Sequence, residues 1–124
     1  MHTFYWGNWY LETVFGPDRA TDISPAQWAL AQGLKYTSHH DAPVALPNSL
    51  AILSSQVTRR TRSRVILGPD QRVSMRDALK SLTGNAAHQY FEEDRKGSIE
   101  TGKLADFVIL NRCPLDIDPD NPEE

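Results

Sequence analysis

The sequence contains a single cysteine, Cys113, which excludes a disulfide within the chain. One cysteine is typical of proteins in a reducing compartment, because oxidising compartments favour disulfide-stabilised chains. The sequence also lacks an apolar run of about 18 residues, the length that a membrane-spanning helix requires. Met1 is not followed by the basic and then apolar pattern of a secretory signal. We therefore expect a soluble, cytoplasmic chain without a membrane partner.

An excess of positive charge is absent as well. The 13 Lys and Arg residues are outnumbered by 16 Asp and Glu residues, and the net charge of −3 argues against a nucleic-acid partner. The basic run formed by Arg59, Arg60, Arg62 and Arg64 has neither interleaved aromatic residues nor a glycine-rich loop. We interpret these arginines as a solvated face or as partners for nearby carboxylates.

Aromatic residues are unevenly distributed. The first fifteen positions contain six of the eleven, namely Phe4, Tyr5, Trp6, Trp9, Tyr10 and Phe15. An edge strand over His2–Trp6, packed on the domain's own core, would cover them, or the chain begins partway through a larger fold. An aromatic face left exposed would favour self-association.

Capping and turn signals divide the middle of the chain into helix, strand and helix. Ser24 before Pro25 predicts a helix that runs to about Gln32 and is closed by Gly33. Leu34–Ser38 reads as a short strand, and a second helix begins at Asn48 or Ser49, with apolar residues at helical spacing. This order is typical of a parallel α/β architecture.

The second half contains a capping box and a later apolar run. Ser74 and Asp77 predict the start of a helix that extends to Leu82. Asn85 is expected to cap a short helix that ends near Phe91. The continuous apolar run Phe107–Leu110 predicts a strand covered on both faces.

The candidate chemistry lies just after the predicted strand Leu34–Ser38. Alternate residues of an extended chain share a face, so the side chains of His39 and Asp41 would point the same way. The carboxyl ends of strands in α/β proteins are where reactive groups gather. The alternative is a solvated His-Asp pair in an ordinary loop.

The residues of several motifs resemble those of one family. The run Lys96-Gly97-Ser98-Ile99-Glu100-Thr101-Gly102-Lys103-Leu104-Ala105-Asp106-Phe107-Val108-Ile109-Leu110 looks like the C-terminal signature of the amidohydrolase superfamily. Further matching motifs are Met1–Gly7, His39–Val44, Thr58–Arg62 and Leu67–Arg72. Together they resemble the amidohydrolase 3 family of YtcJ-like metal-dependent hydrolases.

The resemblance implies an incomplete α/β fold. Residues 1–91 would form the last βα units of a (β/α)8 barrel, and residues 92–112 would return as strands of a small β-sandwich. Residues 113–124 would form an acidic, proline-rich tail.

The resemblance also implies roles for particular residues. Asp41 would bind a divalent metal, expected to be zinc, and take a proton from the attacking water. His39 and His2 would contact a small amide-type substrate. The superfamily's His-x-His pair and its lysine ligand are absent from this sequence. A catalytic zinc normally needs three protein ligands, so we expect the chain by itself to hold no metal and to be inactive.

Two hypotheses therefore follow from the sequence. The first is the C-terminal portion of a metal-dependent amidohydrolase that cleaves C–N bonds. The second is a self-standing, non-catalytic α/β module for binding or oligomerisation. The arrangement of Cys113 as nucleophile and His39 as base is disfavoured, because Pro114 and the tail leave the thiol without an organised site.

Overall fold

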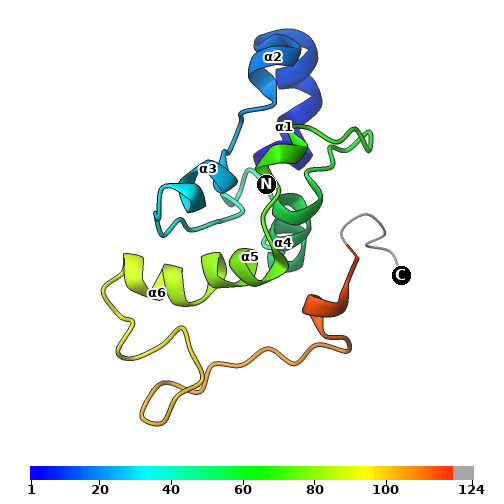
Figure 1. Ribbon diagram of the computed structural model, residues 1–124. Coiled ribbons are helices and arrows are strands. Elements are labelled where there is room, and N and C mark those ends of the chain that lie inside the picture. Colours follow the sequence, from blue (N-terminus) through cyan, green and yellow to red (C-terminus); the bar gives the residue numbers. More distant parts are fainter. Residues whose placement is uncertain (119–124) are drawn as a thin grey trace.

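The computed structural model describes residues 1–118, and over this range the chain is built from short helices (Figure 1). They are α1 (His2–Trp9), the π-helix η1 (Tyr10–Val14), α2 (Gly16–Ala20), α3 (Ala26–Ala31), α4 (Ser49–Thr58), the 3₁₀ turn η2 (Pro69–Gln71), α5 (Met75–Leu82), α6 (Gly84–Gln89) and the 3₁₀ turn η3 (Pro114–Asp116). β-type pairing within residues 1–118 is limited to an isolated antiparallel bridge between Arg60 and Ile66. The prediction of an α/β fold, with barrel βα units and β-sandwich strands, is therefore wrong for this chain.

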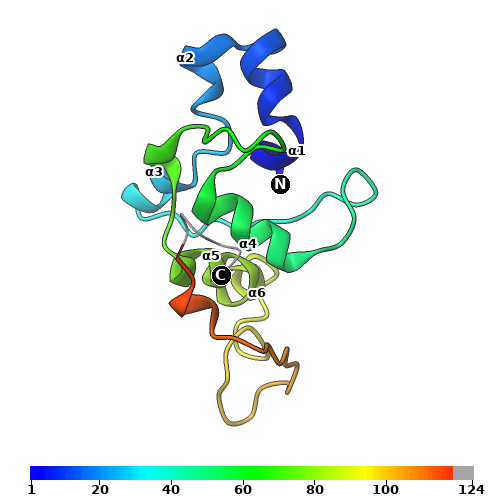
Figure 2. The ribbon, with the colours of Figure 1, turned by 90° about the vertical axis from the view of Figure 1, so that its right-hand side faces the viewer.

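The helices form a stack that Figures 1 and 2 show from two sides. The π-helix η1 contacts both α1 and α2 at one end of the molecule, and α4 packs on α5, which contacts α6. After α6 the chain passes below α5 and α6 and returns so that η3 contacts α5. Within residues 1–118, no helix has both the length and the apolar composition needed to cross a bilayer.

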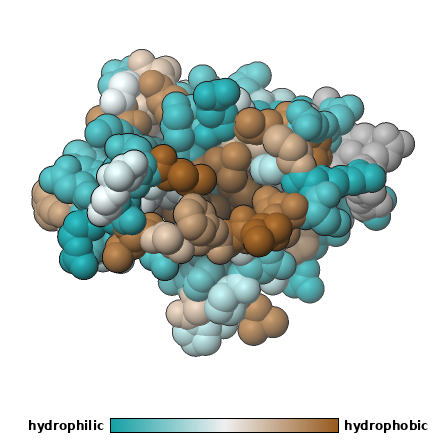
Figure 3. Space-filling model, turned by 90° about the horizontal axis from the view of Figure 1, so that it is seen from below, coloured by the Kyte–Doolittle hydropathy of each residue, from teal (hydrophilic) through white to brown (hydrophobic). Residues whose placement is uncertain are grey.

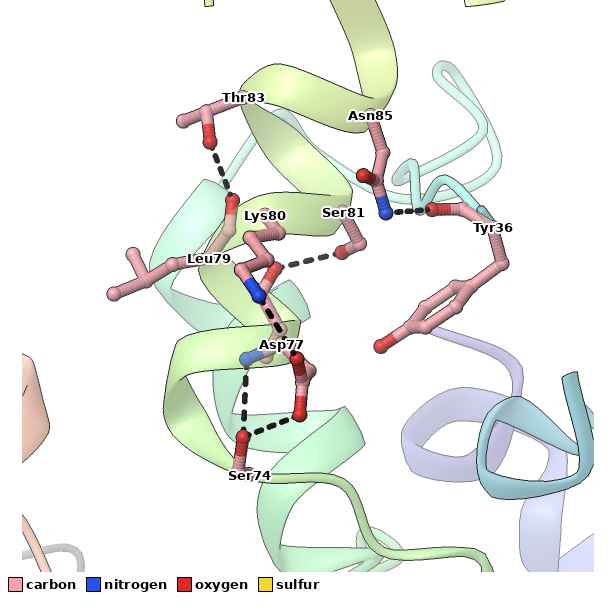
Figure 4. Close-up of polar contacts among 9 residues, drawn as sticks. Tyr36, Ser74, Asp77, Leu79, Lys80, Ser81, Thr83 and Asn85 are labelled. Atoms are coloured by element: carbon pink, nitrogen blue, oxygen red, sulfur yellow. Dashed lines mark hydrogen bonds and ion pairs between the residues drawn. The ribbon is translucent and has the colours of Figure 1, made fainter. Parts of the chain in front are cut away.

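Two helix starts confirm the predicted caps. The side chain of Asn48 accepts a hydrogen bond from the backbone N–H of Ala51 at 3.0 Å, which caps α4. The Ser74 hydroxyl accepts from the backbone N–H of Asp77 at 3.1 Å and donates to its carboxylate at 2.6 Å (Figure 4). Each cap satisfies backbone N–H groups that have no partner within the helix.

The hydrophobic core lies between α4 and α5. Leu53 and Val57 of α4 are buried against Ala78 of α5 and against Val73, which precedes α5. The predicted apolar face of α5 is confirmed, since Met75, Leu79 and Leu82 pack on this cluster. The caps and the helical spacing of apolar residues thus position the two central helices.

The predicted strand Leu34–Ser38 is not a strand. A strand needs a neighbouring strand for its backbone hydrogen bonds, and residues 1–118 supply none beside this segment. The backbone of Ser38 donates instead to the carbonyl of Ser81 at 3.3 Å, and the Asn85 amide donates to the carbonyl of Tyr36 at 3.0 Å. Figure 4 shows Asn85 pointing at this carbonyl, so helices α5 and α6 together supply the hydrogen-bond partners that a neighbouring strand would supply.

Three further boundaries differ from the prediction. Ser24 has a backbone φ of +49° and does not cap α3, which begins at Ala26 after Pro25. Helix α6 begins at Gly84, because the side chain of Asn85 is engaged with Tyr36 and caps nothing. The segment predicted as the edge strand His2–Trp6 lies in helix α1.

Helix α1 packs through its small residues. Thr3 and Gly7 lie one turn apart on the same side of the helix, and both are buried. A Cβ atom at Gly7 would lie 2.7 Å from Cγ2 of Thr61, so only glycine allows this close approach. The aromatic residues point elsewhere, and Phe4, Trp6 and Trp9 are exposed.

The apolar run Phe107–Leu110 is also not a strand, and its side chains are exposed, Ile109 by 97%. The predicted β-sandwich strands of residues 92–112 are therefore absent, because no strand forms within residues 1–118 to pair with this run. Figure 3 views the molecule from the side on which this segment passes, and hydrophobic side chains surround a hollow there. The predicted acidic tail is described only as far as Asp118, and residues 119–124 lie outside the described residues.

Arg59 connects the loop between α2 and α3 to the loop before η2. It is only 2% exposed and follows α4 with a left-handed backbone φ of +56°. Its guanidinium donates to the carbonyl oxygens of Leu67 (2.8 Å), Ser24 (3.1 Å), Thr21 (3.0 Å) and Ile23 (2.9 Å). The interpretation of Arg59 as part of a solvated face is wrong, because the side chain is buried and backbone carbonyls solvate its charge.

We expect Arg59→Met to lower the free energy of unfolding by about 3 kcal/mol, since it leaves buried carbonyl groups without their charged donor. Urea denaturation followed by circular dichroism measures the change. Arg76→Met is the matched control, because Arg76 lies exposed on α5. Equal stability of the two variants would contradict a structural role for the Arg59 guanidinium.

Candidate active site

A cavity of about 360 Å³ brings together the three predicted site residues. His2 from α1 lines it, as do His39 and Asp41 from the segment that follows Ser38. The remaining polar lining includes Tyr36, Gln56 and Arg59. The walls thus come from positions far apart in the sequence, which meet because Arg59 and Tyr36 hold their segments against α4.

A turn, and not a strand, places Asp41 at the cavity. Its backbone φ is +61°, and its carbonyl accepts a hydrogen bond from the N–H of Val44 at 2.8 Å. Both His39 and Asp41 are exposed, and the neighbouring His40 accepts a hydrogen bond from the N–H of Ala42 at 3.2 Å. His39 and Asp41 therefore line the same cavity, but they do not share the face of a strand as predicted.

A series of hydrogen bonds holds Tyr36 and Gln56, two polar side chains that line the cavity. The Tyr36 hydroxyl donates to Oε1 of Gln56 at 2.9 Å, and Nε2 of Gln56 donates to the Ser81 hydroxyl at 3.3 Å. The Ser81 hydroxyl donates in turn to the carbonyl of Ala78 at 2.7 Å (Figure 4). These bonds orient the phenol ring and the amide of Gln56 within the wall.

Burial raises the pKa of Tyr36 from 10.0 to about 12, and the negative charge of Asp77 adds to the rise. Tyr36 is therefore a neutral hydrogen-bonding group at physiological pH. Burial also lowers the pKa of the Arg59 guanidinium from 12.5 to about 10, while the Asp22 carboxylate opposes this drop. Arg59 thus keeps a positive charge in the cavity lining at neutral pH.

The residues present do not fit a metal ion on their own. Over residues 1–118, no three His, Cys, Asp or Glu side chains lie close enough together to form a metal-binding group. Asp41, His39 and His2 share the cavity without making such a group, and the positive charge of Arg59 opposes a second cation nearby.

Sequence reasoning missed the contributions of Gln56 and Arg59 to this site. Gln56 carries no local signal, because its role depends on the approach of Tyr36 from another segment. Arg59 is one of four arginines within six residues, and nothing in that run marks it as the buried one.

Comparison with known proteins identifies the family. The sequence model of the "Amidohydrolase family" matches residues 1–124. The chain belongs to the amidohydrolase family. This membership confirms the resemblance seen in the sequence motifs.

Two relatives cover most of this amidohydrolase chain. N-substituted formamide deformylase from Arthrobacter pascens is 33% identical over 94 residues, which are 76% of the chain and 17% of that protein. The putative amidohydrolase YtcJ from Bacillus subtilis (strain 168) is 28% identical over 115 residues, 90% of the chain and 21% of that protein.

A third relative matches a shorter part of the chain. Protein LONG AFTER FAR-RED 3 from Arabidopsis thaliana is 49% identical over 43 residues, 35% of the chain and 7% of that protein. The chain thus spans about a fifth or less of the length of these curated relatives. No solved structure matches it.

We expect Tyr36 to titrate at a higher pH in the folded protein than in the unfolded chain. The folded pKa of Tyr36 lies above its unfolded value, so its contribution to stability is fully present below pH 10.0 and is lost as the pH rises through about 12. Ultraviolet absorbance of tyrosinate against pH measures the titration. Tyr36→Phe should remove the step near pH 12, whereas Tyr90→Phe, at an exposed position, should leave it in place. A titration without this late step would contradict the buried environment.

Proposed function

We propose that this chain contributes part of the active site of a hydrolase that cleaves amide-type C–N bonds. The observation that carries the proposal is the cavity in which Asp41, His39 and His2 meet, within a chain that matches the amidohydrolase family throughout. One relative is named for the deformylation of N-substituted formamides, so a small N-substituted amide is the proposed substrate class.

Each residue has a proposed role that its position supports. The exposed carboxylate of Asp41 accepts a proton from the water that attacks the substrate carbonyl. The imidazoles of His39 and His2 contact the substrate from two different segments that line the cavity. Tyr36, held by Gln56, keeps the wall in place.

A metal ion is part of this proposal only if further polypeptide supplies additional ligands. A divalent ion, proposed to be zinc, would polarise the scissile carbonyl, and it needs about three protein ligands with one open position. Residues 1–118 contain no such ligand group, and the chain covers 17% and 21% of the two relatives that it matches over most of its length. We therefore propose that the missing ligands lie on polypeptide outside these 124 residues and that the chain alone is inactive.

We expect the purified 124-residue chain to bind no stoichiometric zinc and to release no formate from an N-substituted formamide. Equilibrium dialysis with metal analysis measures the first quantity, and an assay for formate measures the second. Stoichiometric zinc together with turnover would overturn the proposal that the chain is an incomplete site.

The second arm of this experiment uses a longer polypeptide, read from the gene sequence upstream of the codon for Met1. An upstream reading frame that encodes His-x-His would support the proposal, and a stop codon there would count against it. In an active longer protein, Asp41→Asn should lower kcat/KM by about 10²- to 10⁴-fold. Asp70→Asn, an exposed control in η2, should leave kcat/KM unchanged.

The second candidate function is self-association. Trp6, Trp9 and Phe15 are exposed large aromatic residues that Tyr10 joins into one series of ring contacts, and we call these three residues the aromatic face. Trp6 and Trp9 contact each other edge to face, with ring centroids 6.0 Å apart. Contiguous exposed apolar surface of this kind is typical of interaction sites, so a second copy of the chain could cover it.

We expect the weight-average mass in sedimentation equilibrium to rise with concentration if the aromatic face mediates self-association. The double variant Trp6→Ser/Trp9→Ser should then remain monomeric at concentrations where the unmodified chain associates. Trp28→Ser is the matched control, because Trp28 is exposed on α3, outside the face. Association that survives in the double variant would exclude the aromatic face as the interface.

A further inference from the structure

Gln71 is a buried glutamine in the lining of the cavity that contains Asp41, and half of its side-chain amide lacks a partner. It is the last residue of η2 and is only 3% exposed. Its Oε1 accepts a hydrogen bond from the backbone N–H of Trp28 at 3.2 Å. Within residues 1–118, its Nε2 makes no hydrogen bond. Because an amide nitrogen carries two N–H groups, two donors at this cavity are unsatisfied.

The contact with Trp28 fixes which end of the Gln71 amide is the nitrogen. A backbone N–H only donates, so the amide atom that faces it must be the oxygen. Trp28 lies in the first turn of α3, where backbone N–H groups have no partner inside the helix. Gln71 satisfies one of these groups from 43 positions away in the sequence. Exchanging the two amide atoms would break this bond, so Nε2 keeps its position.

The turn that carries Gln71 has an ordered backbone. The N–H of Gln71 donates to the carbonyl of Gly68 at 2.9 Å, and Gly68 adopts a left-handed φ of +62°. The guanidinium of Arg59 donates to the carbonyl of Leu67, directly before Gly68, at 2.8 Å. A ligand in the cavity would therefore meet a donor that is already positioned, which lowers the cost of binding.

Two hydroxyl groups of the same cavity also lack partners. Thr3 of α1 is 2% exposed, Ser55 of α4 is 6% exposed, and both line the cavity. Neither side-chain hydroxyl makes a hydrogen bond in the part of the chain that the structure describes, 1–118. Buried polar side chains have a hydrogen-bond partner in the large majority of cases. Three unpartnered polar groups around one cavity therefore indicate a polar ligand that completes their hydrogen bonds.

We propose that Gln71 is a substrate-binding residue that recognises the carbonyl oxygen of an N-substituted amide. Such an amide carries one carbonyl acceptor and one N–H donor. Nε2 of Gln71 donates to the carbonyl oxygen, and the hydroxyl oxygens of Thr3 and Ser55 are acceptors for the N–H. The substrate class rests on the function proposed above, whereas the unpartnered donor is an observation independent of it.

Gln71→Glu separates the proposed binding role from the contact with Trp28. Glutamate keeps an oxygen that accepts from the Trp28 N–H, and it replaces the NH₂ group by a second oxygen. At pH 7 the carboxylate offers acceptors only, so it repels a carbonyl oxygen. Gln32→Glu is the matched control, because it adds the same charge at an exposed position outside the cavity lining.

Titration of N-methylformamide into the ¹⁵N-labelled 124-residue chain at pH 7, followed by ¹H–¹⁵N NMR spectra, tests the proposal. We expect a saturable shift of the side-chain NH₂ signals of Gln71. The NH₂ signals of Gln56, which lines the same cavity but already donates to Ser81, should shift less. Gln71→Glu should weaken the affinity by about tenfold or more, and Gln32→Glu should leave it unchanged.

The absence of a saturable Gln71 shift would mean that water alone satisfies the donors, and it would overturn the proposal. Unchanged affinity in Gln71→Glu, with the helical circular dichroism signal retained, would overturn it as well. If that variant does not fold, the Gln71 signals of the unmodified chain decide. The assay measures binding without turnover, so an inactive longer protein would contradict the proposed function and leave this result standing. An active longer protein without the Gln71 shift would contradict only the role of Gln71.

Discussion

The buried guanidinium of Arg59 is the interaction on which the structure depends. It collects four backbone carbonyls from two loops, the one between α2 and α3 and the one before η2. Gly68 allows this arrangement, because its φ is +62° and a Cβ atom there would lie 2.0 Å from the carbonyl oxygen of Thr21. The residues of the small α4–α5 core do not include these loops, so the hydrogen bonds of Arg59 hold the two loops together.

The same centre accounts for the cavity that contains the candidate site. Arg59 hydrogen-bonds to the loop between α2 and α3. The hydrogen bonds from Tyr36 to Gln56 and from Gln56 to Ser81 hold the segment that contains Tyr36. His2 and Asp41 then face a common space, although 38 positions separate them in the sequence. Family membership supports the proposal that this cavity is part of an amide-hydrolysing site, and over residues 1–118 no group of three metal-ligating side chains is present.

Exposed apolar surface is the second constraint on function. Segment 107–110 and the aromatic residues of α1 both face outward, on different parts of the molecule. The run 107–110 has the composition of a strand covered on both faces, and within residues 1–118 no strand lies beside it. A longer protein or a second copy would therefore change the environment of these residues more than that of the α4–α5 core.

The sequence by itself determined the helices capped by Asn48 and Ser74, the apolar face of α5, the left-handed Gly33 and the family. Caps, helical spacing and turn residues act over a few positions, so a local pattern is sufficient to predict them. Only the tertiary structure decided that 34–38 and 107–110 are not strands and that Arg59 is buried. A strand requires a partner strand, and a buried charge requires carbonyl groups that are distant in the sequence. Neither can be predicted from the residues next to it.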